Sequence, residues 1–175
     1  MTKPWEAPIS GQSAPVDSAR TLTLADEGAT QRLAQALAPL LGVGDVVTLT
    51  GDLGVGKTAL ARALIRELTG DPLEEVPSPT FTLVQCYETG AGTVWHFDLY
   101  RLSAPDEVFE LGWEEATLNG ILLVEWPERL GALLPSARLD LSLAFDPGGP
   151  DARRVTLSGP GWLARLAPLR LGDSP

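Results

Sequence analysis

Residues 51–58 read Gly-Asp-Leu-Gly-Val-Gly-Lys-Thr and match G-x-x-x-x-G-K-[ST], the pattern of a phosphate-binding P-loop. In such a loop the backbone N–H groups of a glycine-rich turn point at phosphate oxygens. Lys57 can reach the β- and γ-phosphates, and the Thr58 hydroxyl can coordinate Mg²⁺. The residues that we expect to contact the nucleotide in this stretch are Gly51, Asp52, Leu53, Gly54, Val55, Gly56, Lys57, Thr58 and Ala59.

The sequence on either side of the loop has the context that this motif requires. The β-branched run Val46–Thr50 comes before it and predicts a buried strand. After it, residues 59–69 carry their leucines and isoleucine on one helical face, and Gly70 stands where a helix C-cap belongs. We therefore expect strand, turn and helix, with the helix N-terminus adding partial positive charge at the phosphates.

The remaining patterns predict a chain with helices, strands and two antiparallel hairpins. We expect further strands over residues 21–24, 81–87, 94–98, 121–124, 138–145 and 153–158, and further helices over 26–41, 103–118 and 162–167. The turn residues 89–92 and 146–150 join the two hairpins. Pro39 should weaken the end of the first helix, Ser103 with Asp106 suggests a helix start, and Gly112 should break that helix.

Composition indicates one domain with a core of its own. We expect a mobile N-terminal extension over residues 1–19, a single P-loop ATPase domain over 20–168 and a frayed tail over 169–175. The net charge of −10 argues against strong direct binding of nucleic acid, so in an RNA pathway a partner would hold the RNA.

Cysteine usage and hydropathy bear on location. The single cysteine, Cys86, excludes an intrachain disulfide and fits a reducing compartment; its place in the middle of a predicted strand suggests a small core residue. No apolar run approaches the roughly 20 residues that span a bilayer. The N-terminal segment does not resemble a secretory signal peptide, so we expect no membrane association and a cytoplasmic protein.

Two acids compete for the role of the carboxylate that holds Mg²⁺. Ile121-Leu122-Leu123-Val124-Glu125 is typical of a buried parallel strand that ends at a site, so we favour Glu125 as the metal-side carboxylate. Asp98 follows a bulkier strand, and would contact Mg²⁺ through water or orient the attacking water. Either acid could instead cap a helix or pair with an arginine.

Three other polar or aromatic features have both a functional and an ordinary interpretation. Thr80 in Ser78-Pro79-Thr80-Phe81 could sense the γ-phosphate, or it could belong to a simple turn. His96, the only histidine, is expected to bond locally rather than to catalyse. Trp126 could lie beside the nucleotide or pack in the core.

Taken together, the motifs resemble one family. Gly51–Thr58, Ser78-Pro-Thr-Phe81, His96-Phe-Asp-Leu-Tyr-Arg101 and Val124-Glu-Trp-Pro-Glu128 are similar in order and spacing to the TsaE (YjeE) family of small bacterial P-loop ATPases. The resemblance implies an α/β, P-loop NTPase-like fold with a mixed, mostly parallel sheet flanked by helices. It also implies a role in making N6-threonylcarbamoyladenosine (t6A) beside the anticodon of tRNAs that read codons beginning with A.

The resemblance also implies cofactors, partners and residue roles. Members of the family bind ATP and Mg²⁺, hydrolyse ATP slowly and act with a TsaB–TsaD pair, whose complex they reset between turnovers. By motif, Lys57 is the phosphate lysine, Thr58 and Glu125 are magnesium ligands, and Asp98 is the acid important for hydrolysis. Thr30, in the first helix, matches a family position near the nucleotide.

Three other classes of protein share the P-loop. A small-molecule kinase needs an arginine-rich lid over the transferred phosphate, and between Pro105 and Gly131 the only arginine is Arg129. A GTPase is disfavoured because the chain has no N-K-x-D motif and no D-x-x-G after the P-loop. A purely structural nucleotide-binding module stays open, and turnover measurements with candidate partners would separate it from an ATPase.

Overall fold

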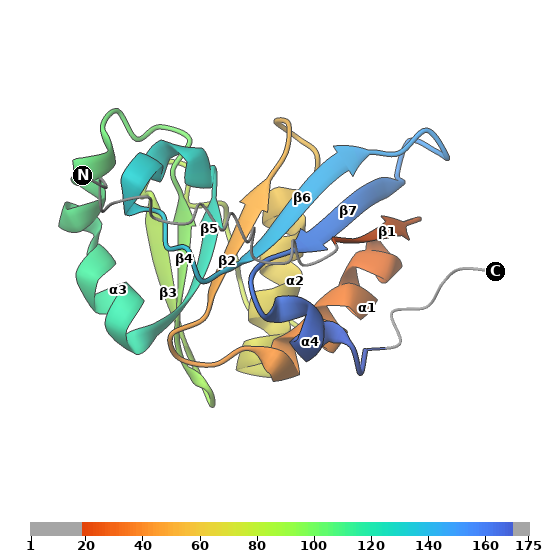
Figure 1. Cartoon of the computed structure of the whole chain (residues 1–175), viewed down its shortest axis with the longest axis horizontal. Coiled ribbons are helices and arrows are strands. Elements are labelled where there is room, and N and C mark those ends of the chain that lie inside the picture. The colour runs from red at the N-terminus through yellow and green to blue at the C-terminus, as the bar shows by residue number, and fades with distance from the viewer. Residues whose placement is uncertain (1–18, 170–175) are drawn as a thin grey trace, which may run out of the picture.

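A seven-stranded sheet runs through residues 19–169, the part of the chain that the computed structural model describes (Figure 1). In chain order the strands are β1 Arg20–Leu24, β2 Val46–Thr50, β3 Val84–Thr89, β4 Gly92–Asp98, β5 Gly120–Glu125, β6 Leu139–Phe145 and β7 Arg153–Ser158. Their order across the sheet is β1-β7-β6-β2-β5-β4-β3. The central pairings β6–β2, β2–β5 and β5–β4 are parallel, and the outer pairings are antiparallel. The predicted mixed sheet with two antiparallel hairpins is confirmed.

Helices cover both faces of this sheet. They are α1 Glu27–Leu37, α2 Lys57–Thr69, α3 Trp113–Asn119 and α4 Trp162–Leu166, with the 3₁₀ helices η1 Ala38–Leu40, η2 Pro105–Leu111 and η3 Pro127–Leu133. As expected, Pro39 ends the α-helical part of the first helix and Gly70 caps α2. None of the helices among the described residues is long and apolar enough to cross a membrane. Apart from Ala19 and Leu169, the segments predicted to be mobile or frayed lie outside these residues.

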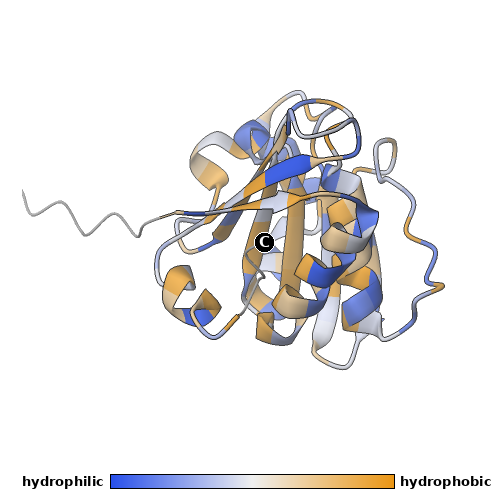
Figure 2. Ribbon diagram, turned by 90° about the vertical axis from the view of Figure 1, so that its right-hand side faces the viewer, coloured by the Kyte–Doolittle hydropathy of each residue, from blue (hydrophilic) through white to orange (hydrophobic). Residues whose placement is uncertain are grey.

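The core is divided into two clusters by the sheet, because the central strands are buried on both sides. On β5, Ile121 and Leu123 join α1 and α2 in one cluster, and Leu122 and Val124 join η2 and α3 in the other. Figure 2 shows the central strands mostly in hydrophobic colours. Glu125 shares the face of Ile121 and Leu123, since side chains two apart on a strand point the same way. Its carboxylate therefore projects toward α2.

Three local predictions are wrong. The third strand begins at Val84 rather than Phe81, because Leu83 has a φ of 64° and its N–H closes a turn on the carbonyl of Pro79 at 2.7 Å. The helix expected from Ser103 is the 3₁₀ helix η2 and begins at Pro105, whose fixed φ suits a first turn. The predicted break at Gly112 is confirmed, with a φ of 84°.

The third wrong prediction concerns Cys86, which is exposed rather than part of the core. It lies on β3, one of the two edge strands of the sheet. The neighbouring Tyr87 takes the buried side and is 7% exposed. Alternation along the strand then turns Cys86 outward.

Candidate functional site

The P-loop joins the end of β2 to the start of α2, as its sequence context predicted. Gly51, Gly54 and Gly56 have φ angles of 135°, 78° and 113°, values that side-chain-bearing residues rarely adopt. A Cβ atom on Gly51 would also collide with the carbonyl oxygen of Leu143. Gly56 directly precedes α2, so the loop turns its backbone toward the helix N-terminus.

Lys57 is held inside this loop. Its side chain is buried, and its Nζ atom donates hydrogen bonds to the carbonyl oxygens of Gly51 at 2.7 Å and Asp52 at 2.8 Å. The ring of Trp126 covers the ammonium at 4.1 Å from its centroid. Burial lowers the pKa of Lys57 from its ordinary value, although the nearby carboxylates, Glu125 first among them, oppose this shift. The loop thus holds the buried ammonium group of Lys57 at the position where phosphate would bind.

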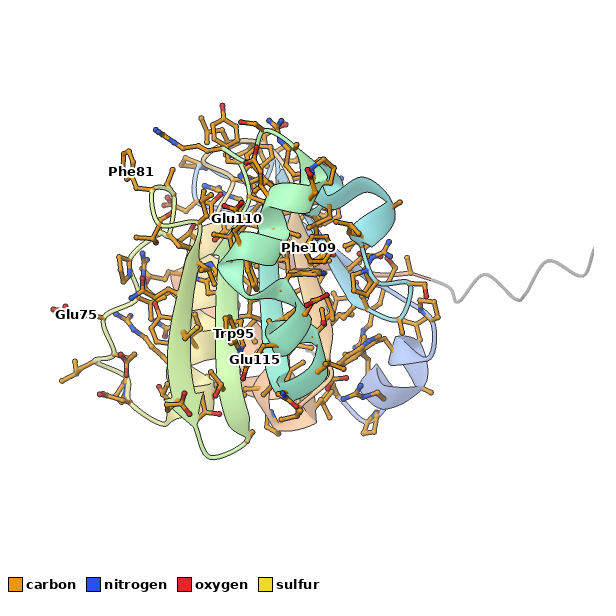
Figure 3. All side chains as sticks on the ribbon, turned by 90° about the vertical axis from the view of Figure 1, so that its left-hand side faces the viewer. Glu75, Phe81, Trp95, Phe109, Glu110 and Glu115 are labelled. Atoms are coloured by element: carbon orange, nitrogen blue, oxygen red, sulfur yellow. The ribbon has the colours of Figure 1, made fainter. Side chains whose placement is uncertain are left out.

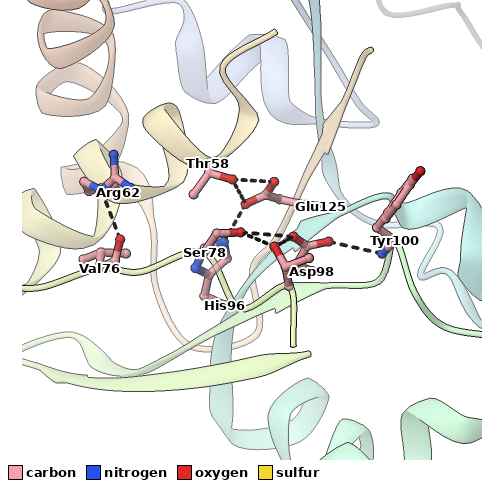
Figure 4. A network of polar contacts seen from close by, with 9 residues as sticks. Thr58, Arg62, Val76, Ser78, His96, Asp98, Tyr100 and Glu125 are labelled. Carbon is pink, nitrogen blue, oxygen red and sulfur yellow. Dashed lines mark hydrogen bonds and ion pairs between the residues drawn. The ribbon is translucent and has the colours of Figure 1, made fainter. Parts of the chain in front are cut away.

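Thr58 and Glu125 meet beside the lysine (Figure 4). The Thr58 hydroxyl lies 3.0 Å from Oε1 and 2.9 Å from Oε2 of the Glu125 carboxylate. The two residues come from the first turn of α2 and the last position of β5. Glu125 is only 2% exposed, so the site buries a carboxylate next to a hydroxyl.

Asp98 ends β4 and lies directly opposite Glu125 in the parallel β4–β5 register. Its Oδ2 atom accepts the hydroxyls of Ser78 at 3.3 Å and Thr80 at 3.2 Å, and its Oδ1 atom accepts the N–H of Tyr100 at 3.1 Å. The loop with Ser78 and Thr80 therefore rests on this carboxylate. Figure 3 shows Phe81 at the tip of that loop, pointing away from the sheet.

Two cavities adjoin the P-loop. The first has a volume of about 220 Å³ and is lined by residues that include Gly54, Lys57, Thr58, Thr80, Asp98, Glu125 and Trp126. The second has a volume of about 790 Å³ and lies between α1 and α2, with Thr30 in its lining. Gly56 and Ala59 line both cavities, so the two adjoin at this part of the loop.

The structure thus brings most of the predicted site residues together. Thr58, Ala59, Thr80, Asp98 and Glu125 share one cavity, and Leu53, Gly54, Gly56 and Lys57 line it as well. Gly51 and Asp52 contribute carbonyl oxygens to Lys57. Val55 is fully buried, and its side chain packs in the core beneath the loop.

The family model for the threonylcarbamoyl adenosine biosynthesis protein TsaE matches residues 24–155 of this chain. The chain belongs to the TsaE family. It is 43% identical over 122 residues to the tRNA threonylcarbamoyladenosine biosynthesis protein TsaE of Rickettsia felis, covering 70% of this chain and 71% of that protein. With the protein of the same name from a Nostoc species it is 36% identical over 146 residues, covering 81% and 88%.

The fold is also shared with a solved structure. A crystal structure of YdiB from Bacillus subtilis is similar with a TM-score of 0.69 and 29% sequence identity, covering 91% of this chain and 97% of that one. The family model continues to residue 155, so the likeness extends beyond Gly131 into β6 and β7. No motif that we could read in the sequence linked that segment to the TsaE family.

The residues that would hold a magnesium ion fit the chemistry of a P-loop site. Mg²⁺ prefers oxygen ligands and is usually held by one or two protein groups, with water and substrate phosphates completing its shell. Thr58 and Glu125 offer a hydroxyl and a carboxylate that already lie within 3.0 Å of each other. Within residues 19–169 no group of three His, Cys, Asp or Glu side chains could form an all-protein metal cage.

Sequence reasoning missed Arg153 and assigned no partner to Trp126 or His96. Trp126 covers Lys57 and contacts Tyr100, with ring centroids 4.9 Å apart. Arg153, at the start of β7, donates its Nε–H to the P-loop carbonyl of Val55 at 2.7 Å. His96 does bond locally, as expected, but its partner is Glu125 at 2.8 Å. Only its position two residues before Asp98 on the same strand could have suggested this.

Proposed function

We propose that this chain is an ATP-binding, slowly ATP-hydrolysing accessory protein of t6A synthesis in the cytoplasm, acting with a TsaB–TsaD-like pair. Membership of the TsaE family supports the t6A role, since the relatives named above are t6A biosynthesis proteins. The observation that carries the ATPase is the contact of the Thr58 hydroxyl with the Glu125 carboxylate at the mouth of a P-loop that encloses Lys57.

The larger cavity suits the nucleoside, and the smaller one suits the phosphates. The cavity of about 790 Å³ between α1 and α2 reaches the loop at Gly56 and Ala59, with Thr30 on its wall. A nucleotide that spans both cavities would put its terminal phosphates beside Lys57, Thr58 and the N-terminus of α2. Thr30 would then contact the nucleoside.

The polar side chains divide the reaction between them. Lys57 would exchange its two carbonyl partners for phosphate oxygens, which are stronger acceptors because they are charged. Thr58 and Glu125 would hold Mg²⁺, which supplies positive charge that offsets the phosphate oxygens. Asp98 would accept a hydrogen bond from the attacking water and orient it toward the phosphate. Thr80 would contact the γ-phosphate, so the conformation of its loop would depend on whether that phosphate is present.

The contacts of Asp98 suggest why hydrolysis by the isolated chain is slow. Its carboxylate accepts hydrogen bonds at both oxygens. Oδ2 accepts the hydroxyls of Ser78 and Thr80, and Oδ1 accepts the N–H of Tyr100. Movement of that loop would free Oδ2 for a water. A partner that draws the loop away would therefore raise the rate of turnover.

The test of this function compares wild type with Lys57→Ala. Loss of one charge-assisted contact, worth about 1.5–3 kcal/mol, should weaken ATP binding roughly 10- to 150-fold and abolish hydrolysis. Arg129→Ala, which removes an exposed cation outside both cavities, is the matched control and should change neither. Wild-type affinity and turnover in Lys57→Ala would refute the site.

The same assay separates an ATPase from the kinase alternative. Wild type should release inorganic phosphate without any small-molecule acceptor, and no acceptor should become phosphorylated. Arg129 is the sole arginine between Pro105 and Gly131, and it is exposed, so the chain offers no arginine lid in that segment. Transfer of the γ-phosphate to a metabolite would favour the kinase.

A further inference from the structure

His96 is a fully buried polar residue that the proposed reaction does not use. It lies on β4, two residues before Asp98, with its ring on the face of the sheet that carries Asp98 and Glu125. Its Nε2 atom is 2.8 Å from Oε1 of Glu125 (Figure 4). The β4–β5 register pairs His96 with Leu123, so the ring reaches diagonally to the carboxylate two positions further along β5.

Hydrogen-bond accounting determines which group donates in the contact between His96 and Glu125. An ionised carboxylate can only accept, so Nε2 must donate to Glu125. The other nitrogen, Nδ1, is buried and has no hydrogen-bond partner among the described residues. The contact with Glu125 is therefore the one side-chain hydrogen bond that the ring makes among the described residues.

Because of this hydrogen bond, the two carboxylate oxygens of Glu125 have different partners. Oε1 accepts from both His96 and Thr58, whereas Oε2 has Thr58 alone as its partner within the described residues. The Thr58 hydroxyl keeps two lone pairs for a cation besides the proton that it donates. His96 is a second donor to Oε1 and fixes that oxygen from the side of β4, so Oε2 has the fewer protein partners and is the better placed oxygen for a cation.

Resting on the magnesium site proposed above, we infer that His96 is a positioning residue for Mg²⁺ binding: it orients Glu125 and makes no contact with the ion. Partners that orient metal ligands typically change metal affinity by roughly 10- to 100-fold when they are removed. A buried histidine that served packing alone would affect stability without this specific effect on the metal.

The test measures how Mg²⁺ concentration controls the binding of a fluorescent ADP analogue. His96→Leu replaces the ring with an apolar side chain of similar bulk that has no hydrogen-bond donor. In this variant, the Mg²⁺ concentration that gives half of the maximal increase in nucleotide binding should rise roughly 10- to 100-fold. Binding in EDTA should stay close to wild type, because the P-loop backbone and Lys57 are untouched. His96→Gln can place an N–H near the original Nε2 and should recover most of the Mg²⁺ response.

Two further variants keep the test decisive. Val94→Ala truncates a fully buried neighbour on the same face of β4 without touching Glu125, so it lowers stability and should leave the Mg²⁺ response unchanged. If His96→Leu does not fold, His96→Asn replaces it: this amide is too short to reach Glu125 and should fail where His96→Gln succeeds. Unfolding midpoints of all variants are recorded alongside.

The outcomes are distinguishable. An unchanged Mg²⁺ response in His96→Leu, or equal responses in His96→Gln and His96→Asn, would overturn the positioning role and leave the ATP site standing. A wild-type protein that binds the nucleotide equally well with and without Mg²⁺ would overturn the magnesium site itself, and the role of His96 with it.

Discussion

Glu125 and Asp98 show how neighbouring residues of like charge acquire different roles. They end adjacent parallel strands, lie in register and are 2% and 4% exposed. Their partners differ, because Glu125 contacts the first turn of α2 through Thr58, and Asp98 contacts the loop of Ser78 and Thr80. The carboxylate that contacts the first turn of α2 suits a metal next to phosphates, and the carboxylate under the loop suits a water.

Nearly isosteric substitutions should separate these two roles. Glu125→Gln should weaken Mg²⁺-dependent ATP binding by about tenfold or more, because it removes the charged metal ligand. Asp98→Asn should bind ATP and Mg²⁺ almost normally and hydrolyse ATP poorly, since it loses the acceptor for the water. Binding titrations at several Mg²⁺ concentrations and single-turnover hydrolysis measure both effects. The opposite pattern would exchange the two assignments.

The pH dependence of ATP binding should report the buried state of Lys57. Burial lowers the pKa of this lysine from 10.5, so in the free protein it loses its proton at a lower pH than an exposed lysine does. Phosphate binding needs the charged form, and ATP affinity should therefore fall as the pH rises toward 10.5 rather than only above it. Isothermal titration between pH 8 and 10.5 tests this. Lys57→Ala provides the control, and a slope as steep as that of wild type in this variant would contradict the explanation.

At the scale of elements, the P-loop is braced by a strand from the far end of the chain. Arg153, at the start of β7, donates to the carbonyl of Val55 across 98 residues of sequence. Its Nη1 atom donates to the carbonyls of Pro150 and Ala152 at 2.9 Å each, so the guanidinium is anchored on its own hairpin. The β6–β7 hairpin therefore helps to set the shape of the loop.

Removing this brace should loosen the phosphate site. Arg153→Ala leaves the Val55 carbonyl without its charged donor, a contact worth about 1.5–3 kcal/mol, and part of that loss should appear as weaker ADP binding. Arg154→Ala, the adjacent exposed arginine paired with Asp146 at 3.1 Å, is the matched control. ADP affinity and unfolding midpoints should both fall in the first variant and stay near wild type in the second. Equal changes in ADP affinity and unfolding midpoint in the two variants would show that Arg153 does not support the loop.

A second prediction at this scale concerns the joint between η2 and α3. Gly112 has a φ of 84°, and a Cβ there would lie 3.0 Å and 3.2 Å from two ring atoms of Trp95. Gly112→Ala should cost about 1–3 kcal/mol of stability, because the backbone strain and the contact add. Gly149→Ala has open space and no positive φ, and should change stability by no more than about 0.5 kcal/mol. Chemical denaturation of both variants measures the difference.

At the scale of the whole molecule, charge limits what the chain can bind by itself. Its net charge is −10, and on η2 and α3 alone Asp106, Glu107, Glu110, Glu114 and Glu115 are exposed. Figure 3 shows Glu110 and Glu115 on these two elements. Phosphate backbones are bound by basic faces, so a chain of this charge is suited to meet tRNA through a partner protein.

We therefore expect no appreciable tRNA binding by the isolated chain at physiological salt and a higher ATPase rate when a TsaB–TsaD-like pair is added. Fluorescence anisotropy with tRNA and phosphate-release assays with and without the pair measure the two quantities. Ser78→Ala, which removes one of the hydroxyls on Asp98, should raise the rate of the isolated chain in the same direction as the pair. Tight tRNA binding, or a rate that the pair leaves unchanged, would favour a free-standing enzyme.

The local elements around the P-loop were predictable from the sequence alone. The strand Val46–Thr50 and the C-terminal end of α2 at Thr69 lie where the sequence predicted them. Both are set by short-range sterics, because β-branched residues favour the extended chain and glycines allow the φ angles of the loop and the helix cap. The motifs that end at Asp98 and Glu125 pointed to one site, since the carboxyl ends of parallel strands meet at one edge of a sheet.

Only the tertiary structure decided how these residues are supported. The order of the strands puts β6 between β2 and β7, and this brings Arg153 to Val55. The β4–β5 register turns His96 toward Glu125, and the edge position of β3 exposes Cys86. Hydrophobic periodicity tells which face of a strand is buried, but it does not tell which strand lies alongside it or in which register. Those contacts arise from the packing of the whole sheet, so they became visible only in three dimensions.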